Sequence, residues 1–551
     1  MARLRSIFAF ACVAALATTM PAPLVGQPPT YVDETALRWN APAAVSTEDV
    51  EEKSYAWGDV DHDGDIDLVV ARKQPWTVPG RRTNVLFLNE GGVLTDRTST
   101  FAVDSDVPGD QGFLTPTCDR DIRLADLDGD GWLDIVTACA LSDGTPKEIS
   151  HPRIYRNLGS ASGTWLGFRY EDARIPQLEG FAPSGFPHAP RFIEVAVGDI
   201  DADGDLDLYF TDHDLGGTQT WDFDDRLLIN DGNGYFADAT TTSFLGTAFF
   251  GYPFAVSWMG TAAVIADMDR DGMPDLVKQS ALAAPLYTGI ALNDPGTPGT
   301  FSEYAIPYTG AGYHVDVGDL NGDGWQDLVI ADNGPDRYLL NQGFGSGVPT
   351  FSLESFSFVQ GQDDGFSSDI VIADLDLDGF PEVLIADIDV DIPGCNRRLH
   401  LYHNQADPPN VTLLESGVQE PWKPNGVHDV AVFDVDGDAW PDLVIGTCAG
   451  TEVWIGVAPL PAFVRGDANA DQNLDIADAV RILGFLFLGL APLDCLDAAD
   501  VNDDGSLDIS DPLFVVARLF TGGSAIPVPN PGCGVDPTPD GLDCAIFAAC
   551  P

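Results

Sequence analysis

Seven segments of the sequence place acidic or amide side chains at positions 1, 3, 5 and 9 of a nine-residue loop. The first segment reads AWGDVDHDGDIDLVVA, where Asp59, Asp61, Asp63 and Asp67 hold those positions and Gly64 holds position 6. Alternate positions can direct oxygens to one point while glycine makes the sharp turn, and position 7 can add its carbonyl. Because all of these donors are hard oxygens, the pattern predicts Ca²⁺ rather than Zn²⁺ or copper.

The first acidic residues of the seven copies lie 52 to 73 residues apart. A hairpin turn rich in Asp and Gly, without a metal, is the alternative interpretation. Four carboxylates so close together would repel one another by roughly 1 kcal/mol per pair even in water, which favours a bound cation. The expected Ca²⁺ ligands are Asp59, Asp61, Asp63, Asp65, Asp67; Asp126, Asp128, Asp130, Trp132, Asp134; Asp199, Asp201, Asp203, Asp205, Asp207; Asp267, Asp269, Asp271, Met273, Asp275; Asp319, Asn321, Asp323, Trp325, Asp327; Asp374, Asp376, Asp378, Phe380, Glu382; and Asp434, Asp436, Asp438, Asp442.

Three copies depart from the pattern. Asn321 replaces Asp at position 3 of the fifth loop, Glu382 takes position 9 of the sixth, and Ala439 replaces the glycine of the seventh. Each change removes a charge, alters the reach of a carboxylate or strains the turn, so we expect these three loops to bind Ca²⁺ more weakly.

Strands must position these loops. Each loop lies between two apolar stretches, and a further apolar stretch ending in Asn follows most loops, as in NVLFLNEGG and RLLINDGNGYF. This pattern predicts about four strands in roughly 60 residues, a length that suits one propeller blade. The last copy ends soon after Trp454, one strand short, and residues 31–39 could supply that strand and close the ring.

With their flanking strands, loops such as GDVDHDGDIDLVVA and ADLDGDGWLDIVTA resemble the FG-GAP or VCBS repeats of bacterial proteins, which are related to the calcium-binding blades of integrin α-subunits. The resemblance covers roughly residues 30–460. It implies an all-β fold, a seven-bladed β-propeller whose Ca²⁺ loops join the first two strands of each blade on one face. In such blades calcium is usually structural and stiffens the hairpins.

Two further loops follow a proline-rich linker, and each precedes an apolar segment with helical character. They have oxygen donors at positions 1, 3, 5, 7, 9 and 12, which is EF-hand spacing with Asp instead of Glu at the end. The expected Ca²⁺ ligands, with position 7 acting through its carbonyl, are Asp467, Asn469, Asp471, Asn473, Asp475, Asp478 and Asp500, Asn502, Asp504, Ser506, Asp508, Asp511.

A duplicated loop and helix of this length resembles a dockerin module, here covering residues 465–522. The resemblance implies a small all-α, calcium-binding domain that docks onto a cohesin-like or other extracellular protein. Helices are expected at 479–488 and 513–520, and both are apolar on nearly every side. Their apolar surface could face such a partner, or could instead pack on the propeller or on the Cys-rich tail.

The N-terminus predicts export. Basic residues precede an apolar run from Ile7 to about Leu16, followed by small residues and prolines, as in a secretory signal peptide. Eight of the nine cysteines follow this segment, an even number that suits disulfides in an oxidising compartment. No later apolar stretch is long enough to span a membrane. We therefore expect a secreted protein, extracellular or at the cell surface.

The composition sets further bounds. With 86 acidic and 27 basic side chains the net charge is −59, which argues against nucleic acid and anionic membranes as partners. A hydrophobic content of 44% is enough for folded cores. The expected organisation is a signal peptide at 1–26, the propeller at 28–458, a linker at 459–464, the dockerin-like domain at 465–522 and a Cys/Pro-rich tail at 523–551.

The sequence assigns no catalytic residue. It contains no HExxH, GxSxG, phosphate-loop or dinucleotide motif, although a carboxylate pair for glycoside hydrolysis stays open. The expected function is extracellular adhesion, glycan binding or complex assembly, and the alternative is a polysaccharide hydrolase or lyase on a propeller scaffold. Aromatic side chains on the face opposite the calcium loops could stack on sugars or pack between blades; they are Trp76, Trp221, Phe223, Phe249, Phe250, Tyr252, Phe254 and Trp258.

Overall fold

The chain divides into two compact units, which are described one at a time. The first spans Pro28–Ala458, and the second contains Pro459–Pro551. The structure is a computed structural model, which describes residues 29–41, 49, 51–73, 80–140, 147–178, 180–181, 187–188, 190–213, 224–256, 258–282, 284–332, 334–345, 347–356, 367–387, 397–416, 426–458, 462–536, 538, 541–542, 544, 547 and 550.

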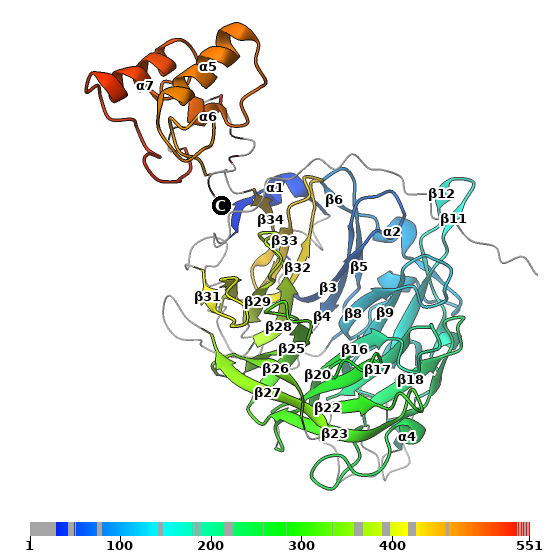
Figure 1. The fold of residues 1–551 in the computed structure, drawn as a ribbon. Helices are drawn as coiled ribbons and strands as arrows, with labels where there is room; N and C mark the ends of the chain where they lie inside the picture. The colour runs from blue at the N-terminus through cyan, green and yellow to red at the C-terminus, as the bar shows by residue number, and fades with distance from the viewer. Residues whose placement is uncertain are drawn as a thin grey trace, which may run out of the picture. The chain divides into compact units, whose positions relative to one another are not determined.

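Seven sheets of four or five strands make the first unit a seven-bladed β-propeller, as the repeats predict (Figure 1). In each blade the strand before the acidic loop pairs with the strand after it, and the later strands follow in order. Blade by blade, the strands are β3 (Glu52–Gly58), β4 (Asp67–Lys73), β5 (Val85–Asn89), β6 (Leu94–Asp96); β8 (Asp119–Ala125), β9 (Asp134–Cys139), β10 (Arg153–Asn157), β13 (Phe168–Tyr170); β16 (Phe192–Gly198), β17 (Asp207–Asp212), β18 (Arg226–Asn230), β19 (Phe236–Asp238); β20 (Gly260–Ala266), β21 (Asp275–Ser280), β22 (Tyr287–Asn293), β23 (Phe301–Tyr308); β24 (Gly312–Gly318), β25 (Asp327–Asp332), β26 (Arg337–Gly345), β27 (Val348–Ser355); β28 (Ser367–Ala373), β29 (Glu382–Asp387), β30 (Leu399–Asn404), β31 (Leu413–Glu415); and β32 (Val427–Phe433), β33 (Asp442–Thr447), β34 (Gly450–Val457).

The N-terminal segment completes the seventh blade. β1 (Thr30–Asp33) pairs antiparallel with β34, and Thr30 lies opposite Val457, 427 residues away in the sequence. After the short helix α1 (Thr35–Arg38), β2 (Trp39–Asn40) adds a parallel strand to β6 of the first blade. The prediction that residues 31–39 close the ring is therefore confirmed.

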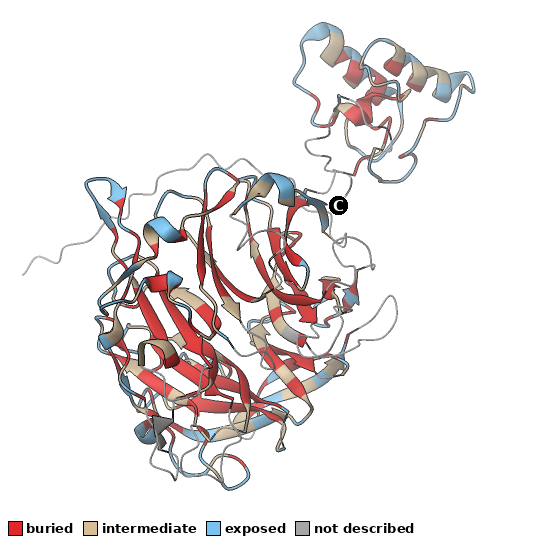
Figure 2. Cartoon of the chain, turned by 180° about the vertical axis from the view of Figure 1, so that it is seen from behind, coloured by how far each residue is buried: buried red, intermediate tan, exposed pale blue. Residues whose placement is uncertain are grey.

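Neighbouring blades pack face to face, and their buried strands form the cores (Figure 2). Between the first two blades, for example, Val69 of β4 packs with Ile122 and Ile135. Both faces of the middle strands are covered, which explains their nearly continuous apolar sequences. The connections hold α2 (Thr98–Phe101), β7 (Asp104–Ser105), η2 (Gly112–Leu114), α3 (Lys147–Ser150), β11 (Ser160–Ala161), β12 (Thr164–Trp165), η3 (Asp172–Arg174), β14 (Gly180–Phe181), β15 (Pro187–His188) and α4 (Thr240–Ser243).

The second unit is a short helical region. Its helices are α5 (Ile476–Leu488), α6 (Leu496–Ala499) and α7 (Ser510–Phe520), and α5 packs on α7 around Ile482 and Val515. Helix α5 begins before the expected residue 479 because a capping box starts it. The Asp475 side chain accepts from Ala477 N–H, and the Asp478 side chain accepts from Asp475 N–H.

The Cys-rich tail packs with these helices. Disulfides join Cys495 to Cys544 and Cys533 to Cys550. The fully buried Arg465 donates to the carbonyl of Asp500 (2.9 Å) and forms an ion pair with Asp536 of the tail (2.7 Å). Within the described part of the chain, none of the helices combines the length and the apolar character needed to cross a lipid bilayer.

Candidate calcium loops and central channel

The backbone of each acidic loop wraps around its own carboxylates. In the first loop Asp59 Oδ1 accepts from Asp63 N–H (3.1 Å) and its Oδ2 accepts from Gly64 N–H (3.2 Å). Asp63 Oδ1 in turn accepts from Asp65 N–H (2.9 Å). The equivalent bonds from position 6 to position 1 recur in the other six loops. The backbone therefore folds around the position-1 carboxylate in every blade, and in the third and fourth blades the side chains at positions 1, 3 and 5 come together.

The carboxylate at position 9 has a second task, which the sequence did not reveal. Asp67 Oδ2 accepts from Val60 N–H (3.0 Å), and its Oδ1 accepts from Asn89 N–H of the third strand (2.9 Å). We call this pair of hydrogen bonds, from the loop and from the third strand to the position-9 carboxylate, the latch. Every blade repeats the latch, through Asp67, Asp134, Asp207, Asp275, Asp327, Glu382 and Asp442.

Burial raises the pKa of these latch aspartates in the metal-free protein. The pKa reaches about 8 for Asp67 and Asp275, and about 7 for Asp134, Asp207, Asp327 and Asp442. The two backbone donors lower the pKa, but the lost hydration outweighs them. A nearby divalent cation would favour the ionised form and release the proton.

In six of the seven blades an asparagine at the end of the third strand bonds to the loop of the preceding blade. Asn230 Nδ2 donates to the carbonyl of Leu127, at position 2 of the preceding loop (2.8 Å), and to Leu206 of its own loop (3.0 Å). The same cross-blade bond is made by Asn89, Asn157, Asn293, Asn341 and Asn404. The recurrent Asn was visible in the sequence, but its acceptor on another blade was not.

The donor set fits calcium. In at least four loops a group of three acidic side chains has ligand atoms within 4.8 Å of one another, for example Asp59, Asp61 and Asp67. Several of these oxygens are buried without a hydrogen-bond partner among the described residues, namely Asp128 Oδ1, Asp201 Oδ1, Asp267 Oδ1 and Asp376 Oδ2. A buried carboxylate oxygen without a partner is costly, and a cation would satisfy it.

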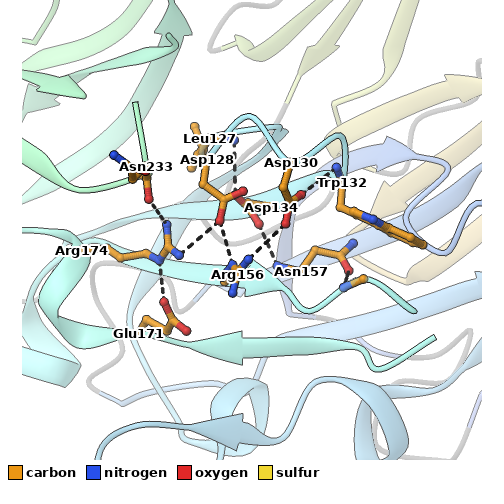
Figure 3. Close-up of polar contacts among 12 residues, drawn as sticks. Leu127, Asp128, Asp130, Trp132, Asp134, Arg156, Asn157, Glu171, Arg174 and Asn233 are labelled. Atoms are coloured by element: carbon orange, nitrogen blue, oxygen red, sulfur yellow. Dashed lines mark hydrogen bonds and ion pairs between the residues drawn. The ribbon is translucent and has the colours of Figure 1, made fainter. Parts of the chain in front are cut away.

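Two arginines already contact the loop of the second blade (Figure 3), and Arg38 likewise lies 3.1 Å from Asp436 of the seventh loop. Arg156 Nε lies 2.7 Å from Asp128 Oδ2, and its Nη2 lies 3.1 Å from Asp130 Oδ2. Arg174 adds a contact of 3.3 Å to the same Asp128 oxygen and donates to the carbonyl of Asn233 in the third blade (2.9 Å). The carboxylates of this loop are therefore already paired with positive charge.

Two positions of each loop adopt left-handed backbone angles. Position 6 is glycine in six loops, with φ of 101° at Gly64, but in the seventh loop Ala439 is held at φ 72°. Alanine is strained there, as the sequence predicts. In the fifth loop Asn321 Oδ1 still accepts from Asp323 N–H (3.0 Å), so the amide keeps the loop shape while removing one charge.

The two C-terminal loops repeat the same local geometry. Asp467 Oδ2 accepts from Gln472 N–H (2.8 Å), and Asp500 Oδ2 accepts from Gly505 N–H (2.9 Å). The last positions close the loops, since Asp478 Oδ2 accepts from Asp475 N–H and Asp511 Oδ2 from Asp508 N–H, both at 2.8 Å. The first and last predicted ligand residues thus both accept backbone N–H groups of their own loop.

A second group of titratable side chains lines a central cavity of about 420 Å³ between the first strands of the blades. His314 lies between two carboxyl groups, with Nδ1 3.5 Å from Glu194 Oε2 and Nε2 3.4 Å from Asp369 Oδ1. Arg123 Nη2 lies 3.4 Å from Glu194 Oε1. The full charged lining is Arg123, Glu194, His314, Asp316, Asp369 and Asp429.

Burial disfavours charge on most of these groups. It raises the pKa of Glu194 and Asp369 well above the ordinary range and that of Asp316 to about 6. It also lowers the pKa of His314, and together with the positive charges of Arg123 and Lys73 brings this pKa to about 3. Neutral acids and a neutral imidazole beside one fixed guanidinium can exchange protons with a bound molecule. The sequence signal was available, since Glu194, His314 and Asp369 each stand five residues before a loop's first acid.

The predicted sugar-stacking aromatics divide between core and surface. Phe249 and Phe254 are buried in the cluster between the third and fourth blades, as the packing interpretation expected. Phe250 is 57% exposed, and Trp258 packs edge-on against Tyr252 at 5.3 Å. Trp76, Trp221 and Phe223 lie outside the described residues.

Comparison with known proteins assigns the family. A family model described as FG-GAP-like repeat matches residues 59–137, 126–210, 199–277 and 319–385. Together these segments cover more than half of the sequence, so the chain belongs to the FG-GAP-like repeat family. The integrin α-like propeller expected from the loops is therefore confirmed.

The relatives are distant and longer. Human integrin alpha-7 is 28% identical over 184 residues, which are 30% of this chain and 15% of the human protein. Mouse integrin alpha-7 is 28% identical over 166 residues, 28% of this chain and 13% of the mouse protein. The chain thus matches only a small part of each relative's length.

Two solved structures are similar to this chain over most of its length. One belongs to an Agrocybe aegerita lectin studied for specific recognition of non-reducing terminal N-acetylglucosamine, with 16% identity, a TM-score of 0.41, and coverage of 71% of this chain and 88% of the lectin. The other is the V. cholerae biofilm matrix protein Bap1, with 12% identity, a TM-score of 0.37, and coverage of 78% and 92%.

Proposed function

We propose that this chain is a secreted, calcium-stabilised propeller that binds partners outside the cell. The observation that carries the proposal is the repeated loop. Backbone N–H groups bind the position-1 carboxylate in every blade, at least four loops gather three acidic side chains, and four loops contain a buried carboxylate oxygen without a partner among the described residues. The ion would be held by the predicted residues of each loop and would act by neutralising them. A loop that is held rigid by its ion would then also fix the neighbouring blade, because the asparagines bond six of the seven loops to the next blade.

The proposed location is extracellular. Two disulfides join described cysteines of the C-terminal unit, and Cys448 of the propeller is also disulfide-bonded. Such bonds persist in oxidising compartments. The proposed signal peptide at 1–26 lies outside the described residues, and N-terminal sequencing of the exported protein tests it. A mature chain that retains its first residues would contradict the proposal.

The second proposal concerns residues 465–522 as a dockerin-like module. Its two loops have matching ligand geometry, and α5 leaves one apolar side in solvent, with Val480 59% and Phe487 62% exposed. These side chains lie seven residues apart on the same side of the helix. We expect this surface to bind a cohesin-like extracellular protein.

Pull-down from the host's extracellular fraction tests the docking surface. The full chain should retain a protein partner in Ca²⁺ and lose it in EDTA. The double variant Val480→Asp, Phe487→Asp should fail to retain the partner even in Ca²⁺. The paired control is Leu37→Asp with Leu245→Asp, which changes exposed leucines of the propeller instead. Partner retention by the α5 variant would exclude this surface.

A glycan partner is proposed for the propeller face that bears Phe250 and Trp258, in the connection between β19 and β20. Phe250 exposes most of its ring, as sugar stacking requires. Glycan-array binding should fall in Phe250→Ala and Trp258→Ala, and the control Phe344→Ala changes another exposed aromatic in the fifth blade. Equal binding by all variants would remove this face from the proposal.

The central cavity favours the alternative, a polysaccharide hydrolase or lyase. Its groups converge without belonging to the metal loops, and Glu194 with a raised pKa could serve as a proton donor. Glu194→Gln and Asp369→Asn should then abolish cleavage of a polysaccharide while leaving its binding intact. If the wild-type protein cleaves none of a broad panel, the enzymatic alternative fails.

A further inference from the structure

In the sixth blade a histidine from the third strand faces two carboxylates of the acidic loop. His403 of β30 directs Nδ1 to Glu382 Oε1 at 3.1 Å and to Asp376 Oδ2 at 3.7 Å. All three side chains are almost completely buried, with exposed fractions of 3%, 0% and 2% for His403, Glu382 and Asp376. Their ligand atoms all lie within 4.8 Å of one another.

The register of the strands shows that the other six blades have a different residue at the position of this histidine. Val383 pairs with Tyr402, which places His403 opposite Glu382, the position-9 acid. The same register position holds leucine in the first, fourth and fifth blades and isoleucine in the third and seventh, as Leu88, Leu292, Leu340, Ile229 and Ile455. Arg156 holds it in the second blade. An apolar side chain is therefore compatible with the fold here, and packing does not require the imidazole.

Unpartnered atoms point to a missing ligand. Asp376 Oδ2 is buried, faces the imidazole and has no hydrogen-bond partner among the described residues. Asp378 Oδ2, at position 5 of the same loop, is buried without a partner as well. Glu382 Oε2 accepts from Leu375 N–H (2.7 Å), and its Oε1 accepts a long bond from Asn404 N–H (3.4 Å) and lies 3.1 Å from His403 Nδ1. Buried polar atoms without partners are rare because each costs free energy.

We propose that Asp376, Glu382 and His403 form a binding site for a first-row transition-metal dication of the zinc type. One imidazole nitrogen and two carboxylate oxygens suit Zn²⁺ or Mn²⁺, whereas Ca²⁺ takes oxygen ligands. Bonds of about 2.0–2.2 Å to zinc would place neighbouring ligand atoms roughly 3.3 Å apart, close to the spacings seen here. Glu382 replaces the usual Asp, and its longer chain can reach both the backbone latch and the imidazole.

Zinc titration of the full-length, metal-stripped protein in saturating Ca²⁺ tests the site. We expect one tight equivalent by calorimetry, and an X-ray absorption spectrum with one nitrogen and several oxygens around the zinc. His403→Leu, which restores the residue of three other blades, should weaken zinc binding by about a hundredfold or more. His62→Leu removes an exposed histidine from the first loop and should bind zinc like the wild type.

The result separates this site from the calcium proposal. His403→Leu should keep the calcium-dependent rise in melting temperature that the other loops provide, which also shows that the variant folds. No tight zinc equivalent in the wild-type protein, an all-oxygen zinc shell, or unchanged zinc binding in His403→Leu would each overturn the inference. Zinc binding without any calcium effect would instead preserve this inference and refute the calcium proposal.

Discussion

At the scale of single residues, the turn of the seventh loop is a test of backbone strain. Ala439 is held at φ 72°, where six other loops have glycine. Ala439→Gly should stabilise the protein by about 0.5–1 kcal/mol, because glycine adopts this angle without a Cβ clash. Chemical denaturation measures the change. Ala449→Gly, at a residue outside the left-handed region, is the control and should destabilise; equal effects of both variants would contradict the strain argument.

Arg156 allows a test of whether a side chain replaces the ion. Its guanidinium is partly exposed, so Arg156→Leu should cost only about 0.5–1 kcal/mol in EDTA. Leucine occupies this register in three other blades, and the uncovered Asp128 and Asp130 should then bind Ca²⁺ more strongly. The calcium-induced rise in melting temperature should therefore be larger in the variant than in the wild type. A smaller or equal rise would mean that Arg156 does not compete with the ion.

Contacts within a loop could be predicted from the sequence, whereas contacts between a loop and a neighbouring strand could not. The spacing of Asp59, Asp61 and Asp63 predicts convergence because those residues are close in the chain. The contact between Arg156 and Asp128 depends on the register of β10 against β9, which the spacing of the loops does not give. His403 was visible only as part of an apolar strand, and its position opposite Glu382 required the same register.

At the scale of elements, the asparagine bonds should determine how firmly blades adhere. Asn230 donates to two buried carbonyls and accepts from Gly232 N–H (3.1 Å) and Gly234 N–H (3.0 Å). Asn230→Leu leaves these four groups unpaired and should destabilise by about 3 kcal/mol in urea unfolding. Asn233→Ala, in the same turn but exposed, should cost less than about 1 kcal/mol. Similar losses for the two variants would show that the cross-blade bond has no special weight.

The latch carboxylates predict an unusual pH dependence in the metal-free protein. Their folded pKa values of about 7 to 8 lie above the ordinary 3.8, so the folded state binds more protons than the unfolded state between these limits. The free energy of unfolding should therefore fall as pH rises from about 4 to 8. Denaturation of metal-stripped protein at pH 5 and pH 8 measures this, and Ca²⁺ should flatten the slope. Higher metal-free stability at pH 8 than at pH 5 would contradict it.

Element positions were largely predictable because each blade repeats one pattern. The loops located the first two strands of each blade. The last blade has one strand too few after Trp454, and this predicted that an N-terminal strand, β1, closes the ring. The helices α5 and α7 followed the expected apolar segments. The central cavity was not predicted, because Glu194 and Asp369 lie 175 residues apart and meet only when the ring closes.

At the scale of the whole molecule, net charge and metal binding are coupled. A chain with net charge −59 repels itself, and the acidic loops concentrate that charge on one side of each blade. Ions bound at several loops would reduce the repulsion and stabilise only the folded chain. Each occupied site contributes about 2.7 kcal/mol when free Ca²⁺ is a hundred times its dissociation constant. Even a few sites would therefore dominate the stability of the propeller.

The most direct test of the central claim is thermal unfolding of the full-length protein in EDTA and in millimolar Ca²⁺, with Mg²⁺ at the same ionic strength as the control. The predicted result is a melting temperature at least about 10 °C higher in Ca²⁺ than in EDTA. Mg²⁺ should have a much smaller effect, because it binds poorly to flexible loops that offer many oxygen ligands. Superimposable curves in EDTA and Ca²⁺ would contradict the claim that the acidic loops are calcium sites.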